Sequence, residues 1–183
     1  GRGVLPTAAP PEEADALMTG VPGLALLVLA ADCVPLLFWD PEHRVVGAAH
    51  AGWRGSVAGM AGRTVAAMGE RYGSRPAQLR AAIGPAIGGC CYEVDGPVLE
   101  PLLRNQARLF QQVATAAARP DRRMLDLKAL NRMQLEAAGL RAENIEVSPL
   151  CTACNADLLY SERRLGRPCG RFGAVIALRD AGR

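Results

Sequence analysis

The chain has few of the residues on which several protein functions depend. Its 183 residues include two tryptophans, three tyrosines and three phenylalanines. These are too few for the stacking surfaces with which proteins bind single-stranded nucleic acid. The net charge is only +3, and the basic residues are scattered along the chain. We therefore expect no nucleic-acid partner.

Long apolar runs are also missing. The longest stretch, residues 21–31, is about half of the roughly 20 residues that a membrane span needs. No basic segment precedes it, which argues against a secretory signal peptide. The sequence thus predicts a buried strand at this position and no membrane partner.

Six cysteines are present, and their context indicates free thiols rather than disulfides. The chain is larger than typical disulfide scaffolds and carries no export signal, so we predict a reducing, cytoplasmic location. The adjacent Cys90 and Cys91 cannot easily bridge to each other. Cys151 and Cys154 have the spacing of a zinc ribbon or a redox pair, but a second pair with this spacing is absent.

Half of the residues are apolar and 21% are charged, which is a globular composition sufficient for one domain with a sizeable core. Ser56 and Asp126 are predicted helix N-caps, and Gly139 is a predicted helix end. Strands and helices alternate without regular βαβ repeats, which predicts the α+β class with mixed sheets. The predicted strands span residues 24–30, 34–39, 45–49, 78–83, 145–150, 158–161 and 172–178. The predicted helices span 56–71, 98–118, with an interruption near Asn105, and 126–138.

Histidine is as scarce as tryptophan, since the chain has only two. His43 belongs to a predicted turn and is most simply a solvated surface residue. His50 follows an apolar strand and precedes glycines that allow close backbone approach, which is where an α/β protein places a reactive group. A core histidine bonded to a backbone carbonyl is the alternative interpretation.

A second unusual string, residues 84–94, argues against that alternative because it also follows an apolar strand and contains Cys90 and Cys91. A thiolate and an imidazole suit zinc or copper, and they also form nucleophile–base pairs. We therefore predict His50, Cys90 and Cys91 as catalytic residues and as metal ligands, without deciding between the two thiols.

Other residues would complete such a site. A catalytic zinc has three protein ligands and an open water position, and the candidates for the third ligand are another cysteine, Asp32 or Gln106. Arg54 is predicted to bind an anionic substrate group through a bidentate contact, although it can equally be an ordinary surface arginine. The basic cluster near the end of the chain is a solvated edge unless it folds back toward His50; it consists of Arg163, Arg164, Arg167 and Arg171.

Eight strings, taken together, resemble the laccase-domain family, which is also called the YfiH or peptidoglycan-editing-factor family. They occur in family order across essentially the whole chain, and HAGWRG together with GPAIG and CYEV is highly specific. The strings are ADALMT (14–19), ADCVP (31–35), HAGWRG (50–55), IGPAIG (83–88), CYEV (91–94), LDL (125–127), CTAC (151–154) and SERR (161–164).

The resemblance implies an α+β fold in which two mixed sheets are packed between helices, related to that of certain toxin cysteine hydrolases. It implies one laccase-like domain over residues 1–183 that lacks the N-terminal segment of the family. It also implies a His–Cys–His metal site, usually occupied by zinc. Carried over to this chain, His50 is the first ligand and Cys90 or Cys91 the second. The third, a histidine expected around residues 106–108, is absent from the sequence.

Activities attributed to the family are phosphorolysis of purine nucleosides and methylthioadenosine, deamination of adenosine, copper-dependent oxidation of phenols, and editing of peptidoglycan precursors. Our first hypothesis is an enzyme of purine nucleoside metabolism with zinc as its metal and a purine nucleoside and phosphate as its small-molecule substrates. The alternatives are a copper-dependent phenol oxidase, a metal-free cysteine hydrolase acting on a muropeptide, and a binding protein that has lost its chemistry. Two histidines are few for multicopper chemistry.

Overall fold

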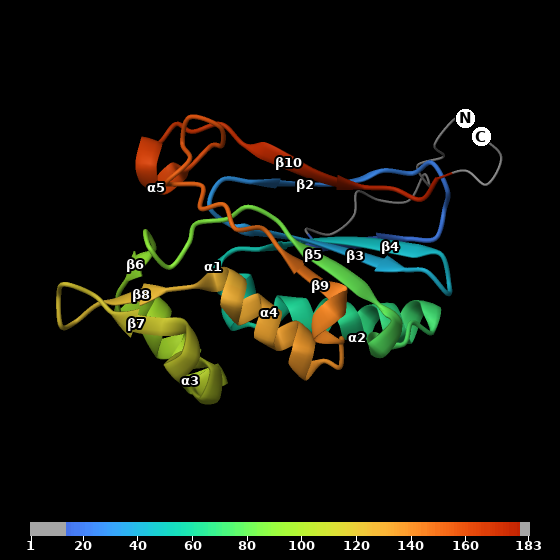
Figure 1. Cartoon of the computed structure of the whole chain (residues 1–183), viewed down its shortest axis with the longest axis horizontal. Coiled ribbons are helices and arrows are strands. Elements are labelled where there is room, and N and C mark those ends of the chain that lie inside the picture. The colour runs from blue at the N-terminus through green and yellow to red at the C-terminus, as the bar shows by residue number, and fades with distance from the viewer. Residues whose placement is uncertain (1–13, 180–183) are drawn as a thin grey trace.

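The computed structural model describes residues 14–179, which form three sheets and five α-helices (Figure 1). The strands are β1 (Ala16–Thr19), β2 (Leu26–Ala30), β3 (Val34–Asp40), β4 (Val45–Ala51), β5 (Arg80–Ile83), β6 (Glu93–Val94), β7 (Ala114–Ala116), β8 (Arg123–Leu125), β9 (Ile145–Val147) and β10 (Phe172–Ile176). The helices are α1 (Trp53–Val57), α2 (Met60–Tyr72), α3 (Gly96–Val113), α4 (Leu127–Ala137) and α5 (Glu162–Leu165), with 3-10 turns at Pro76–Gln78 and Ala142–Asn144.

The largest sheet has five strands in the order β1-β4-β3-β5-β9. Neighbouring strands are antiparallel except β5 and β9, which are parallel. Strand β4 lies inside this sheet and is built almost entirely from small or β-branched residues. These small side chains let other layers approach closely on either side, and both faces of β4 are buried.

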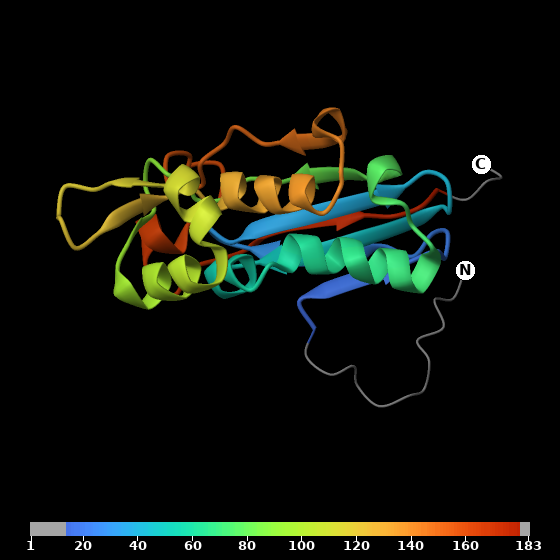
Figure 2. The same cartoon turned by 90° about the horizontal axis from the view of Figure 1, so that it is seen from below.

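The two faces of the five-stranded sheet are covered differently. Helices α2 and α4 lie side by side against one face (Figure 2), and their apolar residues form the main core together with the sheet. The antiparallel pair β2–β10 covers the other face. Strand β2 alternates buried and exposed residues, so Leu26 and Val28 form a second core with Val46 and Ala48 of β4.

The remaining elements gather at one end of the molecule. The short antiparallel sheet β6-β8-β7 and helix α3 lie there, and α5 lies at the same end above them (Figures 1 and 2). The loops that follow β5 and β9 also run toward this end. Residues distant in sequence are thereby brought together at the end of the five-stranded sheet.

The predicted fold class and the predicted N-cap Asp126 are confirmed. The class is α+β with a mixed sheet, although the second sheet is a two-stranded antiparallel pair and the long helices cover one face of the large sheet. Helix α4 is capped as expected, because a side-chain oxygen of Asp126 accepts a hydrogen bond from the backbone N–H of Ala129 at 2.9 Å. Within residues 14–179, no helix is both long and apolar enough to cross a bilayer.

The predicted helix 56–71 is wrong in its first turns. The chain forms the short helix α1, breaks at Ala58 and Gly59, and resumes as α2. Gly59 adopts a left-handed backbone with φ +79°, which stops α1. Ser56 is therefore a buried residue within α1 and not an N-cap, and its hydroxyl donates to the carbonyl oxygen of Ala51 at 3.3 Å.

Two other assignments are also wrong. Residues 158–161 form no strand but a turn that ends at Ser161, the N-cap of α5. The predicted helix 98–118 has the interruption expected near Asn105, at Gln106, whose φ of −144° is not helical. Its end is wrong, because the helix stops at Val113 and Ala114 begins β7. Strand β1 lies at residues for which no strand was predicted.

Candidate functional site

The pairing of β3 with β4 sets the position of His50. Pro35 lies opposite His50 in the antiparallel register, so Asp32 and Cys33, which precede β3, lie beside the end of β4. A Cβ atom built on Gly52 would lie 3.1 Å from Sγ of Cys33 and 3.6 Å from Cε1 of His50. The thiol and the imidazole thus flank the same small space, which only glycine leaves open.

Asp15 holds the imidazole of His50 from the other side. Nδ1 of His50 lies 3.3 Å from Oδ1 of Asp15, and the backbone N–H of His50 donates to the carbonyl oxygen of Asp15 at 2.8 Å. A carboxylate can only accept, so Nδ1 carries the hydrogen in this contact and leaves Nε2 free to exchange a proton. The side chain of His50 is 35% exposed, which makes it accessible to a ligand.

His50 opens into a cleft of about 720 Å³, a size typical of small-molecule sites. Arg54 lies in this cleft with its guanidinium 4.4 Å from the ring centroid of Trp53. Arg54 forms no ion pair with any residue in the described range 14–179. The other lining residues are Leu29, Ala30, Ala31, Asp32, Cys33, Tyr92, Glu162, Arg163, Arg167 and Arg171.

Three of the four arginines in the basic cluster near the end of the chain fold back toward His50, whereas Arg164 does not line the cleft. Arg163, Arg167 and Arg171 all line the cleft. Arg167 and Arg171 lie 2.7 and 3.5 Å from the carboxylate of Glu162. The guanidinium of Arg163 instead stacks 5.0 Å from the ring of Tyr92 and donates to the carbonyl oxygen of Glu93 at 2.9 Å. The cleft therefore has an excess of positive charge suited to an anion.

Asp32 joins the cleft to a second loop. It adopts a left-handed backbone with φ +82°, and its carboxylate accepts a hydrogen bond from Oγ1 of Thr152 at 2.6 Å and another from the backbone N–H of Arg163 at 2.7 Å. Both carboxylate oxygens are thus engaged by the loop at residue 152 and by α5. Asp32 acts as a structural connector, which explains how a partly buried carboxylate is accommodated.

The side-chain amide of Gln106 is also engaged in hydrogen bonds. Its Nε2 donates to the carbonyl oxygens of Ser56 and Val57 at 3.0 and 2.7 Å, and its Oε1 accepts from Nε2 of Gln134 at 2.8 Å. These contacts satisfy carbonyl groups at the end of α1. The amide of Gln106 therefore belongs to a polar network between helices and is not free to bind a metal.

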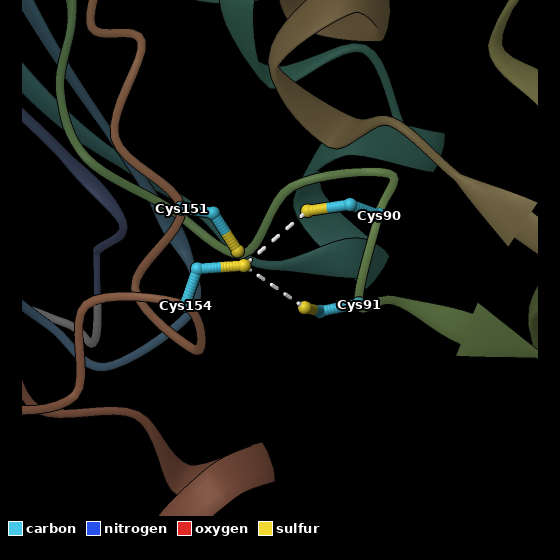
Figure 3. A group of neighbouring side chains, drawn as sticks. All are labelled: Cys90, Cys91, Cys151 and Cys154. Carbon is cyan, nitrogen blue, oxygen red and sulfur yellow. Dashed lines mark hydrogen bonds between the residues drawn. The ribbon is translucent and has the colours of Figure 1, made fainter.

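Cys90 and Cys91 lie in a different group, together with Cys151 and Cys154. Figure 3 shows the four sulfur atoms pointing toward one another from two loops. All four Sγ atoms lie within 4.8 Å of one another, and Sγ of Cys154 lies 3.7 Å from that of Cys90 and 3.4 Å from that of Cys91. These four cysteines can hold a metal ion, and all four are free thiols.

The surroundings shift the pKa values of Cys90, Cys91 and Cys151 in different directions. Burial and the neighbouring thiols raise the pKa of Cys91, and burial also raises that of Cys90. Burial acts in the same direction on Cys151, but backbone N–H groups of Gly88 and Cys154 outweigh it and lower the pKa of Cys151 to about 7. A thiol that loses its proton near neutral pH is a ready metal ligand.

The structure thus brings together only part of the predicted site. His50 and Arg54 share a cleft, whereas Cys90 and Cys91 lie in the four-cysteine group, which does not include His50. Sequence reasoning missed Cys33 as the thiol beside His50, although ADCVP contained it. It also missed Asp15 as the partner of His50, and the convergence of CTAC with the vicinal cysteines.

A family model described as multi-copper polyphenol oxidoreductase laccase matches residues 2–179. The chain belongs to this family. A relative named purine nucleoside phosphorylase YlmD, from Geobacillus stearothermophilus, is 42% identical over 169 residues, which cover 91% of this chain and 60% of the relative. A relative named adenosine deaminase RL5, from an unknown prokaryotic organism, is 38% identical over 160 residues, with coverages of 87% and 60%.

A solved structure has the same fold as this chain. The crystal structure of the hypothetical protein YfiH from Bacillus licheniformis superimposes with a TM-score of 0.85 at 42% identity. The match covers 90% of this chain and 61% of that protein. The chain thus spans about three fifths of the length of each of these three proteins.

The His–Cys–His metal site implied by the family resemblance does not fit the residues of this chain. Gln106 is committed to carbonyl groups, and residues 107 and 108 are an alanine and an arginine. Cys90 and Cys91 converge with two other thiols instead of with His50. No group of three or more close ligand atoms includes His50 anywhere in residues 14–179.

Proposed function

We propose that the cleft binds a purine nucleoside together with inorganic phosphate and splits the nucleoside by phosphorolysis. The observation that carries this proposal is the convergence of His50 and Arg54 in one cleft of about 720 Å³ that three further arginines line. Relatives of this family named purine nucleoside phosphorylase support the same assignment. Adenosine, inosine and methylthioadenosine are the substrates we expect.

Arg54 is the residue that we assign to phosphate. Its planar fork matches two oxygens of an oxyanion, and it has no competing carboxylate among residues 14–179. Arg167 and Arg171 share the carboxylate of Glu162, so their charge is partly neutralised. Trp53 and Tyr92 also line the cleft, and each ring carries an arginine guanidinium, Arg54 or Arg163, which the ring holds in place.

The chemistry needs one nucleophile and one proton. An oxygen of phosphate, held by Arg54, forms a bond to C1′ of the ribose while the bond from C1′ to the purine nitrogen breaks. His50 delivers a proton from Nε2 to the departing purine and regains one from the hydrogen phosphate ion, which loses its proton as its oxygen becomes an ester oxygen, while Asp15 fixes the ring through Nδ1. The products are the free purine and ribose 1-phosphate. Tyr92 has its pKa raised to about 12 by burial, so its phenol stays protonated as a donor.

Deamination of adenosine is a second candidate, because the pairing of His50 with Asp15 is also suited to activating a water molecule. The relative named adenosine deaminase RL5 favours it. In that reaction water attacks the purine carbon that carries the amino group, and ammonia leaves. Phosphate is then not consumed, and this difference separates the two reactions experimentally.

The other hypotheses have less support. His43 lies in the turn before β4 and His50 near the far end of that strand. The strand residues 45–50 between them span about 17 Å, so the two histidines do not share a copper centre. The only thiol that lines the cleft is Cys33. Burial and the neighbouring carboxylates of Asp32 and Glu162 raise its pKa, which opposes the thiolate that a cysteine hydrolase needs.

The test is to incubate the purified full chain with adenosine, with and without inorganic phosphate, and to separate the products by chromatography. We expect adenine and ribose 1-phosphate that appear only with phosphate. His50→Ala should lower the rate by at least about 100-fold, while His43→Ala, which changes the other histidine, should retain activity. Inosine formed equally with and without phosphate would favour deamination. No product in either reaction would refute both.

A further inference from the structure

The four cysteines outside the cleft are arranged as a single-ion site. A tetrahedral zinc ion with Zn–S bonds of about 2.3 Å separates its sulfur ligands by about 3.8 Å. Cys154 lies 3.7 and 3.4 Å from Cys90 and Cys91, and no pair among the four Sγ atoms exceeds 4.8 Å. The separations between the sulfur atoms are therefore close to those that one tetrahedral zinc ion requires.

We propose that Cys90, Cys91, Cys151 and Cys154 bind one zinc ion as a closed structural site, separate from the His50 cleft. Four thiolates fill the tetrahedral coordination of zinc and leave no position for water or substrate, which is typical of structural rather than catalytic zinc. The ion therefore stabilises the fold and takes no part in the chemistry of the cleft. This inference does not depend on the proposed phosphorolysis.

The fold itself brings the two cysteine pairs together. Strands β5 and β9 are parallel neighbours, so the loops that leave their carboxyl ends start side by side. Hydrogen bonds continue the pairing into the loops, because the N–H of Ser148 donates to Ile83 at 2.8 Å and that of Thr152 donates to Ala86 at 3.1 Å. Each loop then delivers two thiols to the same place.

The backbone around the sulfur atoms resembles the outer shell of a metal site. The N–H of Gly88 donates to Sγ of Cys151 at 3.2 Å, and such bonds orient thiolates and stabilise their charge. A Cβ atom on Gly88 would lie 3.2 Å from Sγ of Cys90 and 3.3 Å from Cβ of Cys151. The absence of a side chain at this position lets the two loops approach closely enough for their sulfur atoms to meet.

A buried cation fixes the second loop. Lys128, the only lysine of the chain, is 7% exposed and donates from Nζ to the carbonyl oxygens of Ser148 and Leu150 at 2.8 and 2.9 Å. These bonds hold the residues immediately before Cys151. Lys128 and Cys151 also line one shallow cavity, where the positive charge favours a site that carries two net negative charges.

The geometry favours zinc over an iron–sulfur cluster and over copper(II) or nickel(II). An iron–sulfur cluster spreads its cysteines over several iron atoms, which separates them more widely than ligands of one ion. Copper(II) and nickel(II) favour planar arrangements with nitrogen or oxygen ligands. Disulfide formation is the remaining alternative, and the experiment below distinguishes it.

The first measurement is the zinc content of the full chain, purified under reducing conditions and dialysed, by elemental analysis. We expect one zinc ion per chain. Cys91→Ser and Cys151→Ser should each lower the content at least tenfold, whereas Cys33→Ser and Cys169→Ser, which change thiols outside the cluster, should leave it unchanged. Cobalt(II) added to the metal-free protein should give the charge-transfer and d–d absorption bands of tetrahedral thiolate coordination.

The second measurement needs no variant and stays informative if the serine variants fail to fold. A thiol-reactive chromophore should modify no more than two of the six cysteines when zinc is bound, and all six after the zinc is removed by a chelator. Six reactive thiols in protein incubated with zinc would overturn the proposal. Disulfides within the cluster detected by mass spectrometry, or zinc lost from Cys33→Ser but kept in Cys151→Ser, would also overturn it.

Discussion

The His50 cleft and the four-cysteine cluster lie next to each other but differ in how their polar groups are satisfied. In the cleft, Arg54 has no carboxylate partner among the described residues and Nε2 of His50 is free, so the polar groups keep capacity for a ligand. In the cluster, four sulfur atoms converge within 4.8 Å, so a single ion can satisfy them together. The difference separates a site suited to binding and releasing a substrate from one suited to holding an ion permanently.

The largest effect that separates the two regions is expected from Arg54→Ala. If Arg54 binds phosphate, the KM for phosphate should rise about 100-fold, and the zinc content should not change. Steady-state kinetics with varied phosphate checks this expectation. Arg63→Ala, which removes an exposed arginine of α2 outside the cleft, is the matched control. An unchanged KM in Arg54→Ala would remove Arg54 from the phosphate site.

Gly88→Ala tests the four-cysteine cluster. The added methyl group would press on Cys90 and Cys151, so we expect the zinc affinity to fall by about 10- to 100-fold, as it does when an outer shell is disturbed. Competition with a chromophoric chelator measures this affinity. Gly62→Ala serves as the control, because its Cβ would meet only atoms 3.8 Å away or more. Equal affinities in both variants would contradict the assigned role of Gly88.

Asp32→Asn tests whether the two regions are coupled. Asparagine tolerates the left-handed backbone of Asp32, but its amide cannot accept from both Thr152 and Arg163 as the carboxylate does. We expect about a tenfold loss in kcat/KM and about a tenfold faster release of zinc, which corresponds to the loss of about one hydrogen bond to a charged group. A change in only one of these two quantities would show that the regions are independent.

Ser56→Ala should affect neither region and only lower the stability. The hydroxyl of Ser56 is buried between Ala51 and Asn131, from which it accepts a hydrogen bond at 2.8 Å. Its removal should lower the free energy of unfolding by about 1 kcal/mol, as measured by urea denaturation. The zinc content and KM should remain those of the parent chain. A change in either would mean that this network also positions a functional group.

The sequence predicted the cleft better than the cluster, and the reason lies in the type of pattern. His50 and Arg54 are four residues apart at a strand end, so one local string places both in the cleft. The cluster joins Cys90 and Cys91 to cysteines about sixty residues later. Spacing along the chain cannot reveal that convergence, because it depends on the parallel pairing of β5 with β9.

The errors in predicting single helices and strands arise from contacts between distant parts of the chain. Ser56 had the residue type of an N-cap, but the buried amides of Asn131 and Gln134 supply hydrogen bonds to this residue inside the core. The apolar run at 158–161 resembles a strand, yet Leu158 is 73% exposed and no neighbouring strand pairs with it. Local propensity does not determine structure where packing partners are missing or supplied from elsewhere.

The burial of Lys128 has a practical consequence for chemistry performed on the folded protein. With no other ε-amine in the sequence, acylating reagents directed at lysine have a single side-chain target, and that target is engaged by two carbonyl oxygens. Its acylation must wait until the segment 148–150 releases the amine. The labelling rate at this one position would therefore measure how often that segment opens in the native state.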